Sequence, residues 1–264
     1  MELNEILESV EKVKISIVMQ CNLEDYNNSR SDAISKFHRA VDSFKAQLYN
    51  NCELIIVADG CNKTYQHYMR TYKNEPNIKF IYFDRTDAPK MYDEIPNEDG
   101  TVSKYFRGFA RGIGAAAATG RLVTYMDSDD YLSPEFAMTI MLYYNSDPNR
   151  DWWLNTAWYD HANVINSPQN ANVIVDPNTI ESVRLDYMPG HEFKASRTVD
   201  GKMIMTPWLF THRNYGDVKW VDTISPTVSE DVEFFNRFNA VHPNGTTYQK
   251  PIYVKCHNGG YWDI

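Results

Sequence analysis

The sequence lacks a long apolar stretch, since no run approaches the roughly 20 residues that a membrane-spanning helix needs. It also lacks the plan of a secretory signal peptide, because residues 1–10 are acidic where such a peptide is basic and then apolar. These two absences predict a cytoplasmic protein that makes no stable insertion into a membrane.

Cysteine is scarce, and the four cysteines that are present show no CxxC spacing. A disulfide framework is typical of small secreted chains with many cysteines, so this pattern argues against one. We expect reduced and partly buried thiols at Cys21, Cys52, Cys61 and Cys256.

Positive charge is scarce as well. The chain has 26 Lys and Arg against 35 Asp and Glu, for a formal net charge of −9, and it has no basic run. Proteins that bind nucleic acid by neutralising phosphates usually carry a basic stripe. The composition therefore counts against nucleic acid as the main partner, although a local patch could still hold a nucleic-acid acceptor.

Short apolar runs alternate with amphipathic helical patterns along the first 150 residues. The patterns predict strands at 14–20, 53–58, 78–83 and 122–126, and helices at 33–48, 65–72, 105–118 and 136–144. Such alternation predicts an α/β fold whose parallel sheet has both faces covered. The pattern changes after Pro134: one more helix is expected, and the chain then becomes rich in Trp, Tyr, Asn and Pro. We therefore divide the chain near residue 150, into 1–150 and 151–264. We expect the second part to pack on the same sheet within one compact domain.

Polar residues follow three of the expected strands. They are Gln20–Asn22, Asp59-Gly60 and Asp127–Asp130. Because ligands of such sheets bind at the carboxyl ends of the strands, we expect these three segments to meet at one crevice.

The segment Asp127-Ser-Asp-Asp130 is the most unusual of the three. Three carboxylates in four residues repel one another unless a cation or hydrogen-bond donors compensate them. Mg²⁺ and Mn²⁺ prefer oxygen ligands such as carboxylate and phosphate. A solvated turn with an aspartate capping the next helix is the alternative, but the position at a strand end favours a metal and nucleotide site.

Three segments, 15–22, 53–63 and 107–135, together resemble the donor-binding half of the family 2 glycosyltransferases. The most specific piece is 111–135, with a small-residue helix, a glycine, an apolar strand and then Asp-Ser-Asp-Asp. The Ala and Gly residues of 112–120 are expected to let that helix pack closely on the sheet. The resemblance resumes over residues 206–238.

This resemblance implies a GT-A fold, with a Rossmann-like, mostly parallel central sheet flanked by helices and a C-terminal acceptor-binding portion. It implies an inverting transferase that moves a sugar from a nucleotide diphosphate, with UDP expected, to an acceptor hydroxyl on a saccharide or other glycoconjugate. The expected cofactor is Mn²⁺ or Mg²⁺. Residues 1–150 would bind the donor, and residues 151–264 would bind the acceptor and supply the catalytic base.

The resemblance also implies roles for single residues of the donor half. Asp127, with Ser128 beside it, would contact the donor nucleotide, and Asp129 would hold the metal. The base pocket would use Gln20, Asn22 and Asp59, with Arg111 at the diphosphate or the base edge. The chain departs from the family pattern around Gln20 and Asp59. For Asp59-Gly60 a plain turn is the alternative, and for Arg111 a solvated side chain.

A candidate base lies at the start of a predicted helix, in Ser229-Glu-Asp-Val-Glu. Acidic residues in a first helical turn, after a serine at the N-cap, have a complete structural explanation. Transfer to a hydroxyl also needs a proton acceptor, which a carboxylate can provide. The resemblance implies that Asp231 is this base and that Glu230 is its neighbour.

Two further residues are candidates by position. The resemblance to GT-A enzymes implies His257 as a C-terminal metal ligand, with a structural histidine as the alternative. Trp208 falls where family members line the acceptor pocket, with a core role as the alternative.

Two other functions stay open at this point. One is glycosyl transfer to modified, hydroxymethylated bases of phage DNA. The other is a non-catalytic nucleotide-sugar-binding module, because a fold alone does not fix function.

Overall fold

A computed structural model describes residues 10–23, 33–84, 89, 93–160, 180–184, 192–196, 198–199, 202–203, 205–226 and 228–255. Among these residues, no helix combines the length and apolar character that crossing a membrane requires. His257 and Cys256 lie outside the described residues, as does the side chain of Trp208.

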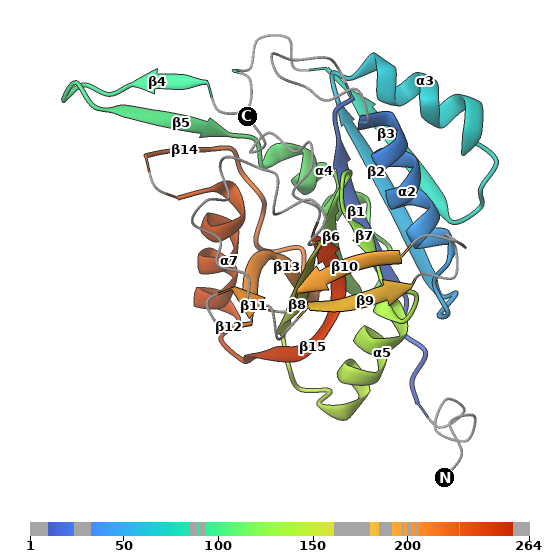
Figure 1. The fold of residues 1–264 in the computed structure, drawn as a ribbon. Coiled ribbons are helices and arrows are strands. Elements are labelled where there is room, and N and C mark those ends of the chain that lie inside the picture. Colours follow the sequence, from blue (N-terminus) through green and yellow to red (C-terminus); the bar gives the residue numbers. More distant parts are fainter. Residues whose placement is uncertain are drawn as a thin grey trace.

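The first half of the chain forms a parallel sheet in the order β3-β2-β1-β6 (Figure 1). The strands are β1 (Ile15–Cys21), β2 (Cys52–Asp59), β3 (Ile78–Phe83) and β6 (Leu122–Asp127). Nearly every residue of β1, β2 and β6 is buried, as expected for strands with both faces covered. The helices between them in the chain are α2 (Ala33–Lys45), α3 (Asn62–Thr71) and α4 (Phe109–Ala117), and α5 (Phe136–Ser146) follows β6.

Successive side chains of β1 point to opposite faces and meet different helices. Ile15, Ile17 and Met19 belong to the core cluster that includes residues of α2 and α5. Val18 points to the other face, where α4 lies against it. A Cβ added at Gly114 of α4 would come within 2.4 Å of Cγ1 of Val18. The small residues therefore bring α4 close to the sheet, as expected.

The second half of the chain extends the same sheet through β13, β8, β10 and β9. These strands are β13 (Met205–Arg213), β8 (Trp152–Asp160), β10 (Glu192–Ser196) and β9 (Ile180–Arg184). The long strand β15 (Gly245–Lys255) pairs with β8 and also with the short β7 (Tyr131–Leu132), which follows the aspartate segment. Strands β3, β2, β1, β6, β8, β15 and β9 point one way, and β13, β7 and β10 point the other. The predicted α/β fold with a mostly parallel central sheet is confirmed.

Smaller elements complete the described chain. Helix α7 (Glu230–Val241) packs on the face that carries Val18. A three-stranded sheet contains β14 (Thr223–Ser225), β5 (Val102–Phe106) and β4 (Glu94–Pro96). It projects beside α4 in Figure 1. The strands β11 (Thr198–Val199) and β12 (Lys202–Met203) form a pair of their own.

Several local predictions were wrong. The helix expected at 105–118 begins only at Phe109, because Tyr105 lies in β5 and pairs with β14. Helix α2 ends at Lys45, so Leu48 lies beyond it and is 64% exposed. On α7, Phe234 and Phe238 lie on the buried face. The cysteines Cys21, Cys52 and Cys61 are free and buried, as predicted.

Candidate functional site

The carboxyl ends of β1, β2 and β6 lie at the same edge of the sheet. Gln20 pairs with Asp127 on one side of β1 and with Val57 on the other, so the ends of the three strands are in register. The Oε1 atom of Gln20 is buried and has no hydrogen-bond partner within the described chain. Asn22 follows two residues later and is exposed. The structure thus brings the predicted polar segments to one place.

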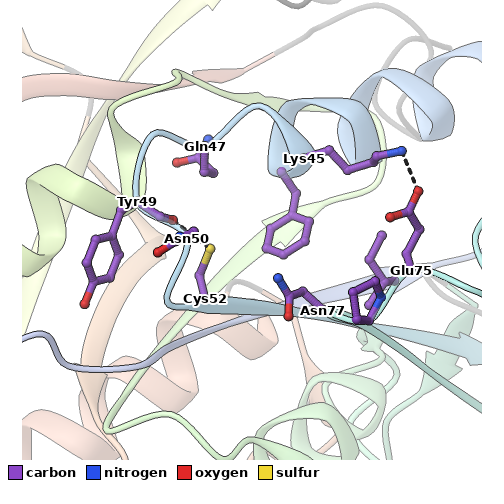
Figure 2. Close-up of a pocket in the computed structure, with 10 residues that line it drawn as sticks. Lys45, Gln47, Tyr49, Asn50, Cys52, Glu75 and Asn77 are labelled. Carbon is purple, nitrogen blue, oxygen red and sulfur yellow. Dashed lines mark hydrogen bonds and ion pairs between the residues drawn. The ribbon is translucent and has the colours of Figure 1, made fainter.

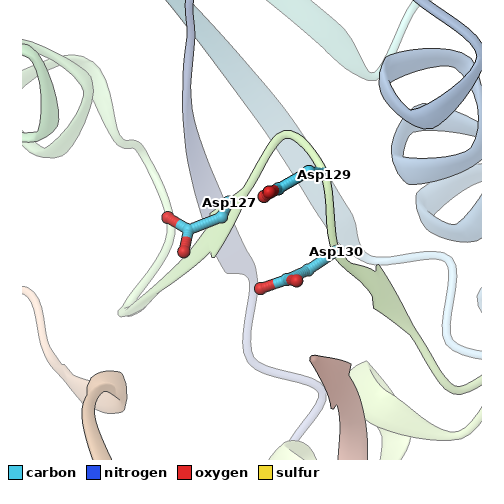
Figure 3. A group of neighbouring side chains, drawn as sticks. All are labelled: Asp127, Asp129 and Asp130. Carbon is cyan, nitrogen blue, oxygen red and sulfur yellow. The ribbon is translucent and has the colours of Figure 1, made fainter. Parts of the chain in front are cut away.

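Three aspartates surround the turn that leads from β6 to β7 (Figure 3). One carboxylate oxygen from each of Asp127, Asp129 and Asp130 lies within 4.8 Å of the others. Asp127, Ser128 and Asp129 are partly exposed, whereas Asp130 is fully buried. This set of hard oxygen donors fits a divalent ion such as Mg²⁺ or Mn²⁺.

Two cations contact the carboxylate of Asp127. Arg111 Nη2 lies 2.8 Å from Oδ1, and Lys255 Nζ lies 2.9 Å from Oδ2. Burial opposes the ionisation of Asp127, but Lys255 and Arg111 outweigh that effect and hold the pKa of Asp127 below its ordinary value. Asp127 is therefore a stable anion between two positive charges.

Asp130 is bound from β15, the last strand of the sheet. Its Oδ2 accepts from the Tyr253 hydroxyl at 2.7 Å and lies 3.1 Å from Lys255 Nζ. The same Tyr253 hydroxyl accepts from the backbone N–H of Asp127 at 3.0 Å. Asp130 does not cap a helix, since α5 begins six residues later at Phe136 with Glu135 at its N-cap. The capping alternative for this segment was wrong.

Asp129 differs from its two neighbours. Within the described part of the chain, its carboxylate makes no hydrogen bond, and only its backbone carbonyl is bound, by Arg39 Nη2 at 2.7 Å. Burial, followed by repulsion from Asp130, raises the pKa of Asp129 from 3.8 to about 7. Asp129 is thus the carboxylate of the three that is open to an added cation.

Arg111 joins the aspartate turn to helix α7. It is buried, its Nη1 lies 2.6 Å from Glu230 Oε1, and its guanidinium lies 5.2 Å above the ring of Trp220. The solvated alternative for Arg111 was therefore wrong. Burial raises the pKa of Glu230 to about 7 despite the attraction of Arg111. One guanidinium thus serves a partly exposed carboxylate on β6 and a buried carboxylate on α7.

Asp231 lies beside Glu230 in the first turn of α7 and is also buried. Its Oδ1 accepts hydrogen bonds from the Ser229 hydroxyl and, at 2.9 Å, from the backbone N–H of Val232. Ser229 occupies the N-cap position, but its side chain makes no capping bond to the helix because the hydroxyl donates to Asp231. These contacts hold the Asp231 carboxylate in one orientation.

Asp59 ends β2 and is followed by Gly60, whose φ of +69° suits the tight turn. Its Oδ2 lies 3.0 Å from Nη1 of Arg107, which also donates to the carbonyl of Pro89. Sequence reasoning missed Arg107, Lys255 and Tyr253. A usable signal existed only for Lys255, a charged residue directly after the apolar run Ile252–Val254.

A separate pocket lies at the opposite edge of the sheet (Figure 2). Cys52 and Ile78, the first residues of β2 and β3, line it, and a 2.6 Å ion pair between Lys45 and Glu75 lies at its margin. Among the described residues that line it, Glu75 is the single carboxylate. The carboxyl-end site is therefore the better candidate for chemistry.

No protein-family model matches the chain, and no curated protein matches its sequence. Solved structures do match its fold. S. aureus TarS 1–349 in complex with UDP-GlcNAc has a TM-score of 0.59 at 15% identity over 94% of this chain and 59% of that chain. The mannosyltransferase PcManGT from Pyrobaculum calidifontis, in complex with GDP-Man and Mn²⁺, has a TM-score of 0.52 at 11% identity over 92% of this chain and 56% of that one.

The chain thus spans less than three fifths of the length of either protein. At these identities the likeness concerns the fold, and it confirms the predicted GT-A architecture.

Proposed function

We propose that this chain is a glycosyltransferase that moves a sugar from a nucleotide diphosphate donor to an acceptor hydroxyl with the help of a divalent ion. The observation that carries the proposal is the aspartate turn at the carboxyl ends of the parallel strands, with the Asp129 carboxylate open to a cation. The GT-A fold supports it, because two proteins with that fold were solved with nucleotide sugars bound.

The aspartates would hold the ion, with Asp129 as the first ligand and Asp127 or Asp130 beside it. A bound divalent ion would supply positive charge to the departing diphosphate. Gln20, Asn22 and Asp59 would face the nucleotide, because they end the strands beside the turn. Uracil is the proposed base, since the Asp59 carboxylate can accept a hydrogen bond from the N–H group of uracil.

Asp231 is the proposed general base. It is a buried carboxylate whose orientation is fixed by Ser229 and by the helix backbone, which suits a group that must meet the acceptor oxygen in one geometry. Glu230 would act through Arg111 as a positioning residue, because the same guanidinium holds Asp127 of the donor side. The bond to the diphosphate would break as the acceptor oxygen attacks and its proton passes to Asp231.

The next two roles are proposed on sequence grounds alone. His257 would add a nitrogen ligand to the ion, and Trp208 would line the acceptor pocket within residues 151–264. Ser128 would lie next to the nucleotide, since it is partly exposed within the aspartate turn.

The test is a panel of UDP- and GDP-linked sugars with Mn²⁺, in which donor hydrolysis and transfer are measured for the wild type and for Asp231→Asn. We expect the variant to lose about 10²–10⁴-fold in turnover, the usual contribution of a general base, and to bind donor as the wild type does. Glu233→Gln is the matched control, because Glu233 lies in the same helical turn but pairs with Arg237 near the surface.

A wild type that binds nucleotide sugars and turns over none of them would contradict the proposal and favour a binding module. Equal turnover in Asp231→Asn would contradict the assignment of the base and leave the donor site intact.

A further inference from the structure

We propose that Lys255 is a resident cation of the aspartate site and that a divalent ion must displace it in order to bind. The inference rests on the proposed function only in taking the aspartate turn as the metal site. It adds that the chain carries its own competitor for that metal.

The position of Lys255 is set by backbone pairing. Strand β15 runs antiparallel to β7, with Tyr253 opposite Leu132 and Val254 opposite Tyr131. Because β7 follows the aspartates directly, this register brings the last residue of β15 next to the turn. The Tyr253 hydroxyl fixes it further through its bonds to Asp130 and to the backbone of Asp127. Lys255 is therefore held at the site by the sheet itself.

Lys255 engages oxygens that a metal would need. Its Nζ lies 2.9 Å from Asp127 Oδ2 and 3.1 Å from Asp130 Oδ2. The other oxygen of Asp127 is held by Arg111, which Glu230 shares. Both oxygens of Asp127 are thus occupied by cations of the chain. Lys255 thus occupies one oxygen of Asp127 and one of Asp130, so a divalent ion that takes either oxygen as its second carboxylate ligand must displace the ammonium.

An ammonium and a divalent ion repel each other when they share one carboxylate, and the repulsion is strong where water is largely excluded. The side chain of Lys255 is 16% exposed, so it is not completely enclosed by the protein. A lysine also has a flexible stem that lets its charge relocate while the backbone stays in place. The site can therefore exchange Lys255 for a metal without disrupting β15.

The first experiment measures Mn²⁺ affinity by calorimetry, with no nucleotide present, for the wild type, Lys255→Met and Lys255→Arg. We expect Lys255→Met to bind Mn²⁺ roughly tenfold more tightly or better, the low end of the coupling seen between close charge pairs. Lys255→Arg keeps the charge and should gain nothing. Lys14→Met is the matched control, since Lys14 lies 3.0 Å from Glu53 at the other end of the sheet.

Equal or weaker Mn²⁺ binding by Lys255→Met, including no binding at all, would overturn the proposal and make Lys255 an organiser of the ligands. Because the assay uses neither donor nor turnover, its outcome is independent of whether the chain transfers sugar. A chain without transferase activity could still show the exchange, and an active transferase could lack it.

The second experiment uses the wild-type protein, so it does not depend on the folding of a variant. Lysine acetylation is followed by mass spectrometry with and without Mn²⁺. Displacement by the metal predicts that labelling of Lys255 rises several-fold, while labelling of Lys14 stays constant. Unchanged or reduced labelling of Lys255 at saturating Mn²⁺ would overturn the proposal.

Discussion

The parallel strands carry a buried carboxylate at their amino ends and a group of carboxylates at their carboxyl ends. At the amino ends, Glu53 accepts from the Ser16 hydroxyl at 2.7 Å and the Thr119 N–H at 2.8 Å, and two lysines lie within 3.0 Å of it. Burial alone would raise the pKa of Glu53, but these partners lower it from 4.5 to about 2. At the carboxyl ends, the pKa values of Asp129 and Glu230 are both raised to about 7.

The two groups differ in how many partners each carboxylate has. The single carboxylate of Glu53 is bound by two lysines and by further hydrogen-bond donors. At the carboxyl ends, by contrast, Arg111 and Lys255 are each shared between two carboxylates. A fully compensated carboxylate stabilises the fold over a wide pH range. Carboxylates with too few positive partners destabilise the folded protein and attract an added cation, as is common at functional sites. This difference agrees with a structural role for the amino-end group and with the proposed chemistry at the carboxyl-end group.

The largest expected effect is that of Arg111→Met. This change leaves Glu230 and Asp127 without their shared guanidinium in a buried position, so we expect the free energy of unfolding to fall by about 3–5 kcal/mol. Urea unfolding at pH 7 measures it. Arg121→Met removes an exposed pair with Glu11 and should change stability by less than about 1 kcal/mol. If Arg111→Met and Arg121→Met lost similar amounts of unfolding free energy, Arg111 would not be the cation that holds the carboxyl-end group together.

A smaller effect is expected for Glu53→Gln. The pKa of Glu53 is about 2 in the folded protein against 4.5 as the reference, so its stabilisation is present above pH 4.5 and is lost as the pH falls towards 2. We expect a loss of about 2–3 kcal/mol at pH 7 that vanishes near pH 2, with unchanged donor binding.

Unfolding curves between pH 2 and 7 test this pH dependence. Glu75→Gln at the surface pair with Lys45 is the control and should lose less than about 0.5 kcal/mol. A pH-independent loss in Glu53→Gln would show that the charge of Glu53 is not what stabilises the amino-end group.

The smallest expected effect has the opposite sign. Asp129→Asn removes a carboxylate whose pKa is raised from 3.8 to about 7, so the variant should be more stable in metal-free buffer. The gain is absent below pH 4, grows as the pH rises to 7 and stays constant above it. We expect a gain of about 2 kcal/mol in the free energy of unfolding. This is less than the full pKa shift implies, because a buried amide also needs hydrogen bonds.

Thermal unfolding without metal, and again with Mn²⁺, measures this trade-off. The wild type should gain stability from Mn²⁺ and Asp129→Asn should gain little. If Asp129→Asn were less stable than the wild type at pH 8 without metal, the Asp129 carboxylate would stabilise the fold as Glu53 does. The distinction between the carboxyl-end and amino-end groups would then fail.

The sequence predicted the parallel half of the fold well because each strand there is a continuous apolar run bounded by polar residues. The run 78–83 matches β3 residue for residue, and 122–126 misses only the last residue of β6. The strand β5 was missed since Tyr105 fits the period of the following helix. In the structure β5 pairs with the short β4 and with β14, which is more than a hundred residues away.

The aspartate turn could be predicted from its own four residues, but its partners could not. Arg111 is buried because Glu230 and Asp127 reach it from α7 and β6, a contact that no local pattern encodes. Lys255 meets Asp127 across 128 positions of the chain. The residues that set the charge balance of the site are distant from it in the sequence. A local sequence pattern does not show which distant residues lie next to the site in the folded protein.

The pairing of β15 with β7 also bears on how the protein folds. The bonds from Tyr253 to Asp130 and from Lys255 to Asp127 span 123 and 128 positions, so they close long loops and form slowly compared with local helices. During synthesis, the early strands β1, β2 and β6 can associate well before residue 245 leaves the ribosome. The aspartate turn is then completed only in the last stage of folding, and partly folded chains carry three carboxylates without their lysine.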